Sequence, residues 1–136
     1  MTALPFARVL VTGAAGLLGR CVVDALHASG VAVTALELAA HDDLVVDRLV
    51  VGSAGDVDVV RDALDGVNAI VHLAAIRAPG LASPERVFLG NTAATFTVLE
   101  QGALAGIRRA AIASSWAITG LPFARTLRQP AYLPVD

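Results

Sequence analysis

Three glycines near the N-terminus stand three residues apart, at Gly13, Gly16 and Gly19. Glycine has no Cβ atom, so Gly13 can turn sharply, Gly16 can let the backbone approach a bound group, and Gly19 can let a following helix pack closely. The N–H groups at the start of such a helix attract phosphate groups. We therefore predict a turn that holds a dinucleotide pyrophosphate, and the alternative is a plain turn between a strand and a helix. The residues expected at this contact are Gly13, Ala15, Gly16, Leu17 and Leu18.

A glycine turn has this meaning only between a strand and a helix, and the surrounding sequence predicts both. Apolar runs predict strands at 8–12, 31–36, 49–52, 67–74 and 109–114, and helical spacing predicts helices at 17–29, 57–64 and 84–105. Strands that are apolar on both faces and alternate with helices are typical of a covered parallel sheet. The expected fold is α/β, a Rossmann-like doubly wound parallel sheet of order 3-2-1-4-5, truncated after strand five.

One acidic residue, Glu37, ends the second predicted strand about 20 residues beyond the glycines. A carboxylate at this place can accept hydrogen bonds from the hydroxyls of the adenosine ribose. The same negative charge repels a phosphate on the ribose 2′ position. Glu37 therefore favours NAD over NADP, and the alternative is a solvated carboxylate at the end of a strand.

The composition of the chain argues against several other classes of protein. The chain has 136 residues, of which 56% are hydrophobic, so residues 1–136 suit one domain. With a net charge of -2 and no basic stripe, nucleic acid is not an expected partner. The single cysteine, Cys21, excludes a disulfide framework and a thiolate metal cluster, and we expect it to be buried in the first helix. No apolar run approaches the roughly 18 residues that span a bilayer, so we expect a cytoplasmic protein without a membrane or metal site.

Four segments in the same order resemble the extended short-chain dehydrogenase/reductase family, also called the NAD-dependent epimerase/dehydratase family. They are the glycine turn at 11–19, Ile-Val-His-Leu-Ala-Ala at 70–75, the Asn-led helix at 91–100, and Ala-Ser-Ser-Trp-Ala-Ile-Thr-Gly at 113–120. The resemblance implies an NAD-dependent oxidoreductase, epimerase or dehydratase that acts by hydride transfer on a nucleotide sugar or a sugar-like substrate. It leaves open whether the protein forms a homodimer.

The resemblance also assigns roles to single residues. Ser115 matches the catalytic Ser/Thr, and the backbone of Leu73, Ala74 and Ala75 would lie along the nicotinamide ribose. Ser53 stands where many relatives have an Asp for adenine, and Asp56 is the alternative residue for that contact. Asn91 is counted among the cofactor-binding residues, behind the site, where it would either bond the backbone of the loop after strand four or cap a helix turn. His72 lies in an apolar strand, so we interpret it as a hydrogen-bonded core residue rather than a base.

One part of the family's chemistry is missing from the sequence. Proton transfer in the family requires a Tyr-x-x-x-Lys pair, in which the lysine lowers the tyrosine pKa. The only tyrosine is Tyr132, and Asp136 stands four residues after it. We therefore expect an incomplete, cofactor-binding portion that is inactive alone, with the pair and the substrate-binding part beyond residue 136. The alternative is a NAD(P)-sensing module without catalysis.

Overall fold

The computed structural model describes residues 5–78 and 80–115. Its centre is one sheet in which all described strand pairs are parallel and the order is β3-β2-β1-β4-β5. The strands are β1 (Arg8–Thr12), β2 (Ala32–Glu37), β3 (Arg48–Val51), β4 (Ala69–His72) and β5 (Ala110–Ile112). The predicted fold class and strand order are thus confirmed. In a parallel sheet the carboxyl ends of the strands share one edge, and this edge carries the candidate site.

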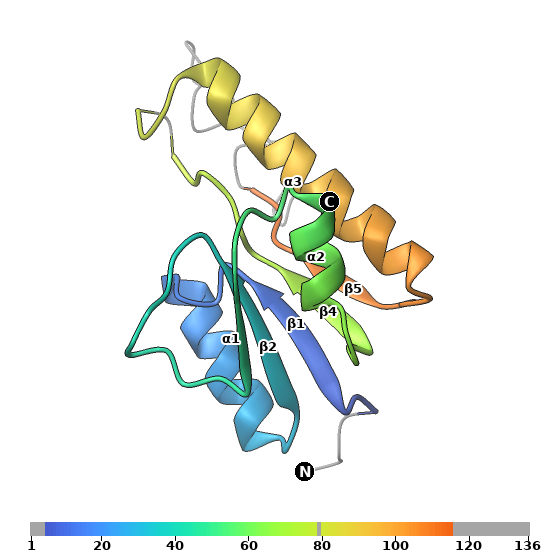
Figure 1. The fold of residues 1–136 in the computed structure, drawn as a ribbon. Helices are drawn as coiled ribbons and strands as arrows, with labels where there is room; N and C mark the ends of the chain where they lie inside the picture. The colour runs from blue at the N-terminus through green and yellow to red at the C-terminus, as the bar shows by residue number, and fades with distance from the viewer. Residues whose placement is uncertain (1–4, 79, 116–136) are drawn as a thin grey trace, which may run out of the picture.

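Helices cover both faces of the sheet (Figure 1). They are α1 (Leu17–Ala28), α2 (Val57–Ala63) and α3 (Pro84–Leu104). Alternate residues of β1 divide the core, because Val9 and Val11 pack with Val23 of α1, whereas Leu10 packs with residues of α2 and α3. This alternation is the period-two pattern of a strand that is buried on both sides.

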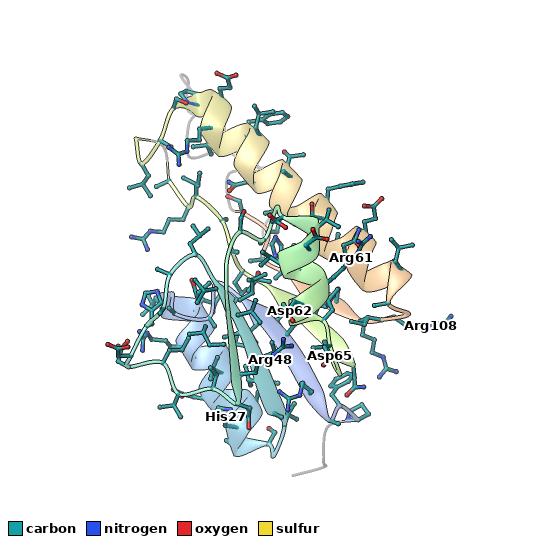
Figure 2. The ribbon with its side chains drawn as sticks, viewed as in Figure 1. His27, Arg48, Arg61, Asp62, Asp65 and Arg108 are labelled. Carbon is teal, nitrogen blue, oxygen red and sulfur yellow. The ribbon has the colours of Figure 1, made fainter. Side chains whose placement is uncertain are left out.

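Ion pairs secure some of these layers at the surface. Arg48 of β3 contacts Asp62 of α2 at 2.7 Å, and both side chains are labelled in Figure 2. His27 at the end of α1 contacts Asp47, just before β3, at 3.1 Å. Exposed pairs of this kind contribute little to stability, on the order of 0–1 kcal/mol, so the apolar layers supply most of the packing energy.

The expected elements are all present, with shorter ends at two strands. β4 begins at Ala69 rather than at 67, and just before it the N–H groups of Ala7 and Arg8 donate to the side-chain oxygen of Asn68 rather than to a backbone carbonyl of a strand. At its other end, β4 stops at His72, and the N–H group of Leu73 lies within hydrogen-bond distance of both the carbonyl and the hydroxyl oxygen of Thr12. β5 is also shorter than predicted, and its three residues are exposed.

The expectation that Cys21 is buried is wrong, because its side chain is exposed. Gly19 and Val23, which are the buried residues of α1, stand four positions apart on one face. Cys21 lies two positions from each of them, about 200° around a helix of 3.6 residues per turn. It therefore faces away from the sheet.

Within the described ranges, no helix combines the length and the hydropathy that would let it cross a membrane.

Candidate functional site

The glycine turn connects β1 to α1 at the carboxyl edge of the sheet. Gly13 has a φ of 71°, a left-handed conformation that favours glycine. A Cβ atom at Gly13 would stand 2.8 Å from the backbone nitrogen of Ala74, and one at Gly19 would clash with the carbonyl oxygen of Gly13. At Gly13 the turn is therefore packed directly against the residues that follow β4. At Gly19 the first turn of α1 is packed against the glycine turn itself.

The N-terminus of α1 differs from those of α2 and α3. Asp56 caps α2 and Ser83 caps α3 with side-chain hydrogen bonds, whereas Gly16 at the N-cap of α1 offers no side chain. The first residues of α1 are also unusually exposed for apolar side chains, since Leu17 is 87% and Leu18 57% exposed. An uncapped helix start, whose N-cap residue Gly16 has no Cβ atom, fits a phosphate-bearing group.

Glu37 reaches across to the glycine turn. Its carboxylate accepts a hydrogen bond from the N–H group of Ala15 at 2.5 Å, and its carbonyl accepts one from Gly52 at 2.8 Å. The second bond places the end of β3 beside Glu37. Ser53, the next residue, accepts a hydrogen bond from the N–H group of Gly55 at 3.1 Å. The sequence-predicted residues Ala15, Glu37 and Ser53 thus lie along one edge.

Asp56 has a structural function at the start of α2. Its Oδ1 atom accepts hydrogen bonds from the N–H groups of Asp58 at 2.9 Å and Val59 at 3.2 Å. These are the bonds of an N-cap residue, and such a cap is typically worth about 1 kcal/mol. The cap explains this carboxylate without an adenine contact.

A buried polar chain that sequence reasoning missed joins β1, β4 and α3. The Thr12 hydroxyl oxygen accepts hydrogen bonds from the N–H groups of Leu73 at 3.2 Å and Ala74 at 3.1 Å. It also lies 2.7 Å from Nδ1 of His72, whose Nε2 lies 3.2 Å from the Thr95 hydroxyl. The sequence indicated that His72 is hydrogen-bonded, but it did not identify Thr12 and Thr95 as the partners.

These bonds indicate the proton positions on His72. Because Thr12 Oγ1 already accepts two N–H groups, its own hydrogen donates to Nδ1, and Nε2–H donates to Thr95. His72 is only 3% exposed, and burial lowers its pKa, which favours the neutral ring. The interpretation of His72 as a hydrogen-bonded core residue is confirmed.

Asn91 holds the loop that follows β4. Its Oδ1 atom accepts a hydrogen bond from the N–H group of Ile76 at 2.8 Å, and its Nδ2 donates to the Ile76 carbonyl at 3.1 Å. Of the two alternatives for Asn91, this geometry is the first, a bond to the backbone of the loop. An open cavity of about 450 Å³ lies beside it, lined by Asn91, Thr92, Thr95 and Phe96 of α3.

Ser115 follows β5, so it stands at the same edge of the sheet as the glycine turn. The N–H group of Ala113 donates to the His72 carbonyl at 3.1 Å, which extends the pairing of β5 with β4 toward Ser115. The Ser115 side chain is exposed. Tyr132 and the segment 116–120 lie outside the described residues.

The fold and the uncapped glycine turn together define a Rossmann-type, NAD-binding class of domain. A model of the NAD dependent epimerase/dehydratase family matches residues 9–131. The chain belongs to this family, as the resemblance of its four segments predicted.

Individual proteins agree with this assignment. The chain is 36% identical over 117 residues to sterol demethylase protein B of Methylococcus capsulatus, covering 82% of this chain and 35% of that protein. It is 35% identical over 134 residues to a UDP-glucose 4-epimerase of Azospirillum brasilense, covering 91% and 38% respectively. The chain thus spans just over a third of the length of these relatives.

A solved structure has the same fold. A short-chain dehydrogenase/reductase superfamily protein from Agrobacterium tumefaciens with bound NAD superposes with a TM-score of 0.78. The two sequences are 35% identical, and the match covers 94% of this chain and 37% of the other.

Proposed function

We propose that this chain is the dinucleotide-binding part of an NAD-dependent enzyme that transfers hydride to and from a sugar-like substrate. The observation that carries the proposal is the uncapped start of α1, which follows a glycine turn that is packed against Ala74. Bound NAD would supply the hydride acceptor. The polypeptide would supply binding, orientation and the exclusion of water.

Each side of the turn has a proposed role. The N–H groups after Gly16 would bind the pyrophosphate, and the carboxylate of Glu37 would bind the adenosine ribose hydroxyls, with Ser53 near the adenine. The backbone of Leu73, Ala74 and Ala75 would border the nicotinamide ribose. Thr12 supports this role, because its hydroxyl holds the N–H groups of Leu73 and Ala74.

The reacting end of the site would lie near Ser115. Its hydroxyl would hydrogen-bond to the substrate oxygen, which loses or gains a proton when the attached carbon loses or gains the hydride. The substrate class we propose is a nucleotide sugar or a related sugar, in line with the name of the UDP-glucose 4-epimerase relative. The chain contains no lysine and only one tyrosine, so we expect it to bind NAD without turnover. Measured turnover of a nucleotide sugar by this polypeptide would contradict that expectation.

Isothermal titration of the chain with NAD tests the binding proposal, with Gly16→Ala as the diagnostic variant. Gly16 has a φ of −67° that alanine adopts readily, and the added Cβ atom would stand 3.2 Å from the Gly13 carbonyl oxygen. The variant should therefore fold but bind NAD at least about tenfold more weakly, because the methyl group occupies the approach of the pyrophosphate.

Gly90→Ala is the matched control. Gly90 lies within α3, and its Cβ atom would meet only Ile76 at 3.7 Å, an ordinary contact. The variant should fold, since alanine is a better helix former than glycine. Its NAD affinity should stay within about twofold of that of the original chain, because the added methyl group lies outside the glycine turn. Equal NAD affinity in the original chain and Gly16→Ala, or no NAD binding at all, would disprove the proposed role of the turn.

A further inference from the structure

The side chain of Arg20, in the first part of α1, folds back onto the glycine turn. Its Nε–H group donates to the carbonyl oxygen of Ala15 at 3.0 Å. Its Nη2 atom lies 2.9 Å from Oδ2 of Asp43, and its Nη1 donates to the Asp43 carbonyl at 3.5 Å. Asp43 belongs to the segment between β2 and β3, which runs beside α1 (Figure 1). One guanidinium group therefore joins the glycine turn to this segment.

The Arg20 contact completes a set of bonds that hold Ala15 from both sides. The N–H group of Ala15 bonds to the carboxylate of Glu37, and its carbonyl accepts the bond from Arg20. The same peptide unit ends in the N–H group of Gly16, which donates to the Gly13 carbonyl at 3.2 Å. Because the C=O and N–H bonds of a trans peptide point in opposite directions, these contacts fix the plane of the last peptide before α1.

Electrostatics do not explain why an arginine stands at this place. A positive charge near the start of a helix opposes the positive end of the helix dipole, and the first turn of α1 has no acidic residue to offset it. The pair with Asp43 balances the charge of Arg20, but both side chains are more than a third exposed, so the pair adds little to stability. The contact that remains to be explained is the hydrogen bond to Ala15.

We propose that Arg20, anchored by Asp43, is a positioning residue for the dinucleotide site. By bonding the Ala15 carbonyl oxygen, it keeps this partial negative charge turned away from the pyrophosphate and leaves the N–H groups at the start of α1 to bind it. The inference rests on the proposed dinucleotide function and adds a residue that acts through the backbone of Ala15. The competing explanation is that Arg20 binds the pyrophosphate directly as a cation.

Titration of the whole chain with NAD separates these two roles through Asp43→Ala. If Arg20 positions the turn, loss of its anchor should weaken NAD binding by about threefold or more. If Arg20 bound the pyrophosphate as a cation, the same substitution would remove a competing carboxylate and strengthen NAD binding. Stronger or unchanged NAD binding to Asp43→Ala would therefore overturn the proposal.

Asp42→Ala is the matched control for the lost carboxylate. Asp42 is exposed in the same segment, and over residues 5–78 and 80–115 it has no basic side chain within 4.0 Å. Its NAD affinity should stay within about twofold of that of the original chain. Thermal unfolding should confirm that both variants fold.

Arg20→Ala tests the guanidinium group itself and should bind NAD about tenfold or more weakly. Added guanidinium ion, below denaturing concentrations, should restore most of this affinity because it replaces the lost planar set of donors. Methylammonium should not restore it, since a single ammonium group does not reproduce that fork. Both ions should leave the original chain unchanged. Restoration by neither ion, or by both equally, would contradict the positioning role.

Amide hydrogen exchange at Gly16, measured by NMR without NAD, tests the positioning separately from the proposed function. In Arg20→Ala this amide should exchange at least about fivefold faster, whereas the amide of Val60, a buried residue of α2, should be unchanged. Unchanged exchange at Gly16 would overturn the inference and leave NAD binding by the original chain as it is. If the original chain binds no NAD, the proposed function fails, and faster exchange at Gly16 would still show that Arg20 holds the turn.

Discussion

The carboxylate of Glu37, at the end of β2, accepts a hydrogen bond from the N–H group of Ala15 in the glycine turn, with a distance of 2.5 Å. The bond spans two neighbouring strands, β2 and β1, at the point where each ends. It holds a negative charge beside the uncapped start of α1. The position of this carboxylate, and not only its presence in the sequence, should therefore determine whether the site prefers a free or a phosphorylated adenosine ribose.

Glu37→Gln should change the preference between dinucleotides. A charged hydrogen bond is worth about 1.5–3 kcal/mol, so loss of the charge should weaken NAD binding by about tenfold or more. NADP should bind at least as tightly as to the original chain, because the amide does not repel a 2′-phosphate. Parallel titrations with the two dinucleotides measure this shift in preference.

Asp65→Asn removes the same charge elsewhere and serves as the control. Asp65 is exposed, lies just beyond α2 and carries a label in Figure 2. Its affinities should match those of the original chain. A Glu37→Gln variant with an unchanged ratio of NAD to NADP affinity would remove Glu37 from the ribose contact.

His72 should make the stability of the fold depend on pH in a defined direction. Burial lowers its pKa below 6.5 in the folded chain, so the unfolded chain binds the proton more readily. The free energy of unfolding should be highest above pH 6.5. It should fall as the pH decreases from 6.5 through the lower folded pKa.

Urea unfolding between about pH 7.5 and 5 measures this effect. A hydrogen bond from the Arg20 side chain lowers the pKa of Asp43, and one from the Val33 N–H group lowers the pKa of Asp47. Both carboxyl groups therefore affect stability below pH 3.8, outside this pH range. His72→Asn should be less stable, yet its stability should vary less with pH over the window. The same slope in both proteins would show that another group titrates.

Asn91 should control the order of the loop after β4. Asn91→Ala removes both hydrogen bonds to Ile76, and each neutral bond is worth about 0.5–1.5 kcal/mol. We expect the Ile76 amide to exchange its hydrogen at least about tenfold faster, since 1.4 kcal/mol corresponds to that factor.

Thr92→Ala is the neighbouring control on α3. Thr92 is exposed and borders the cavity beside Asn91. Its removal should leave exchange at Ile76 unchanged. If Asn91→Ala also left that exchange unchanged, the loop would be held by other contacts than the Asn91 pair.

Sequence reasoning predicted the order of the elements because the signals involved are local. Glycines at the ends of β1 and α1 and apolar runs of strand length can each be identified within a short window. The sheet order followed from the handedness of parallel crossovers. The exposure of Cys21 was not predicted, because it depends on which face of α1 meets the sheet.

By itself, the sequence determined a doubly wound sheet with a glycine turn, an acidic end to β2 and an Asn-led α3. Only the tertiary structure decided how these parts meet. The register of β1 and β4 places Thr12 opposite His72, where the threonine hydroxyl contacts one ring nitrogen of the histidine. The other ring nitrogen contacts Thr95 of α3. Likewise, Leu38 and Arg86 share a cavity although 48 positions separate them in the printed sequence. Such contacts depend on the packing of distant segments at one sheet edge, whereas sequence periodicity shows only which face of each segment is apolar.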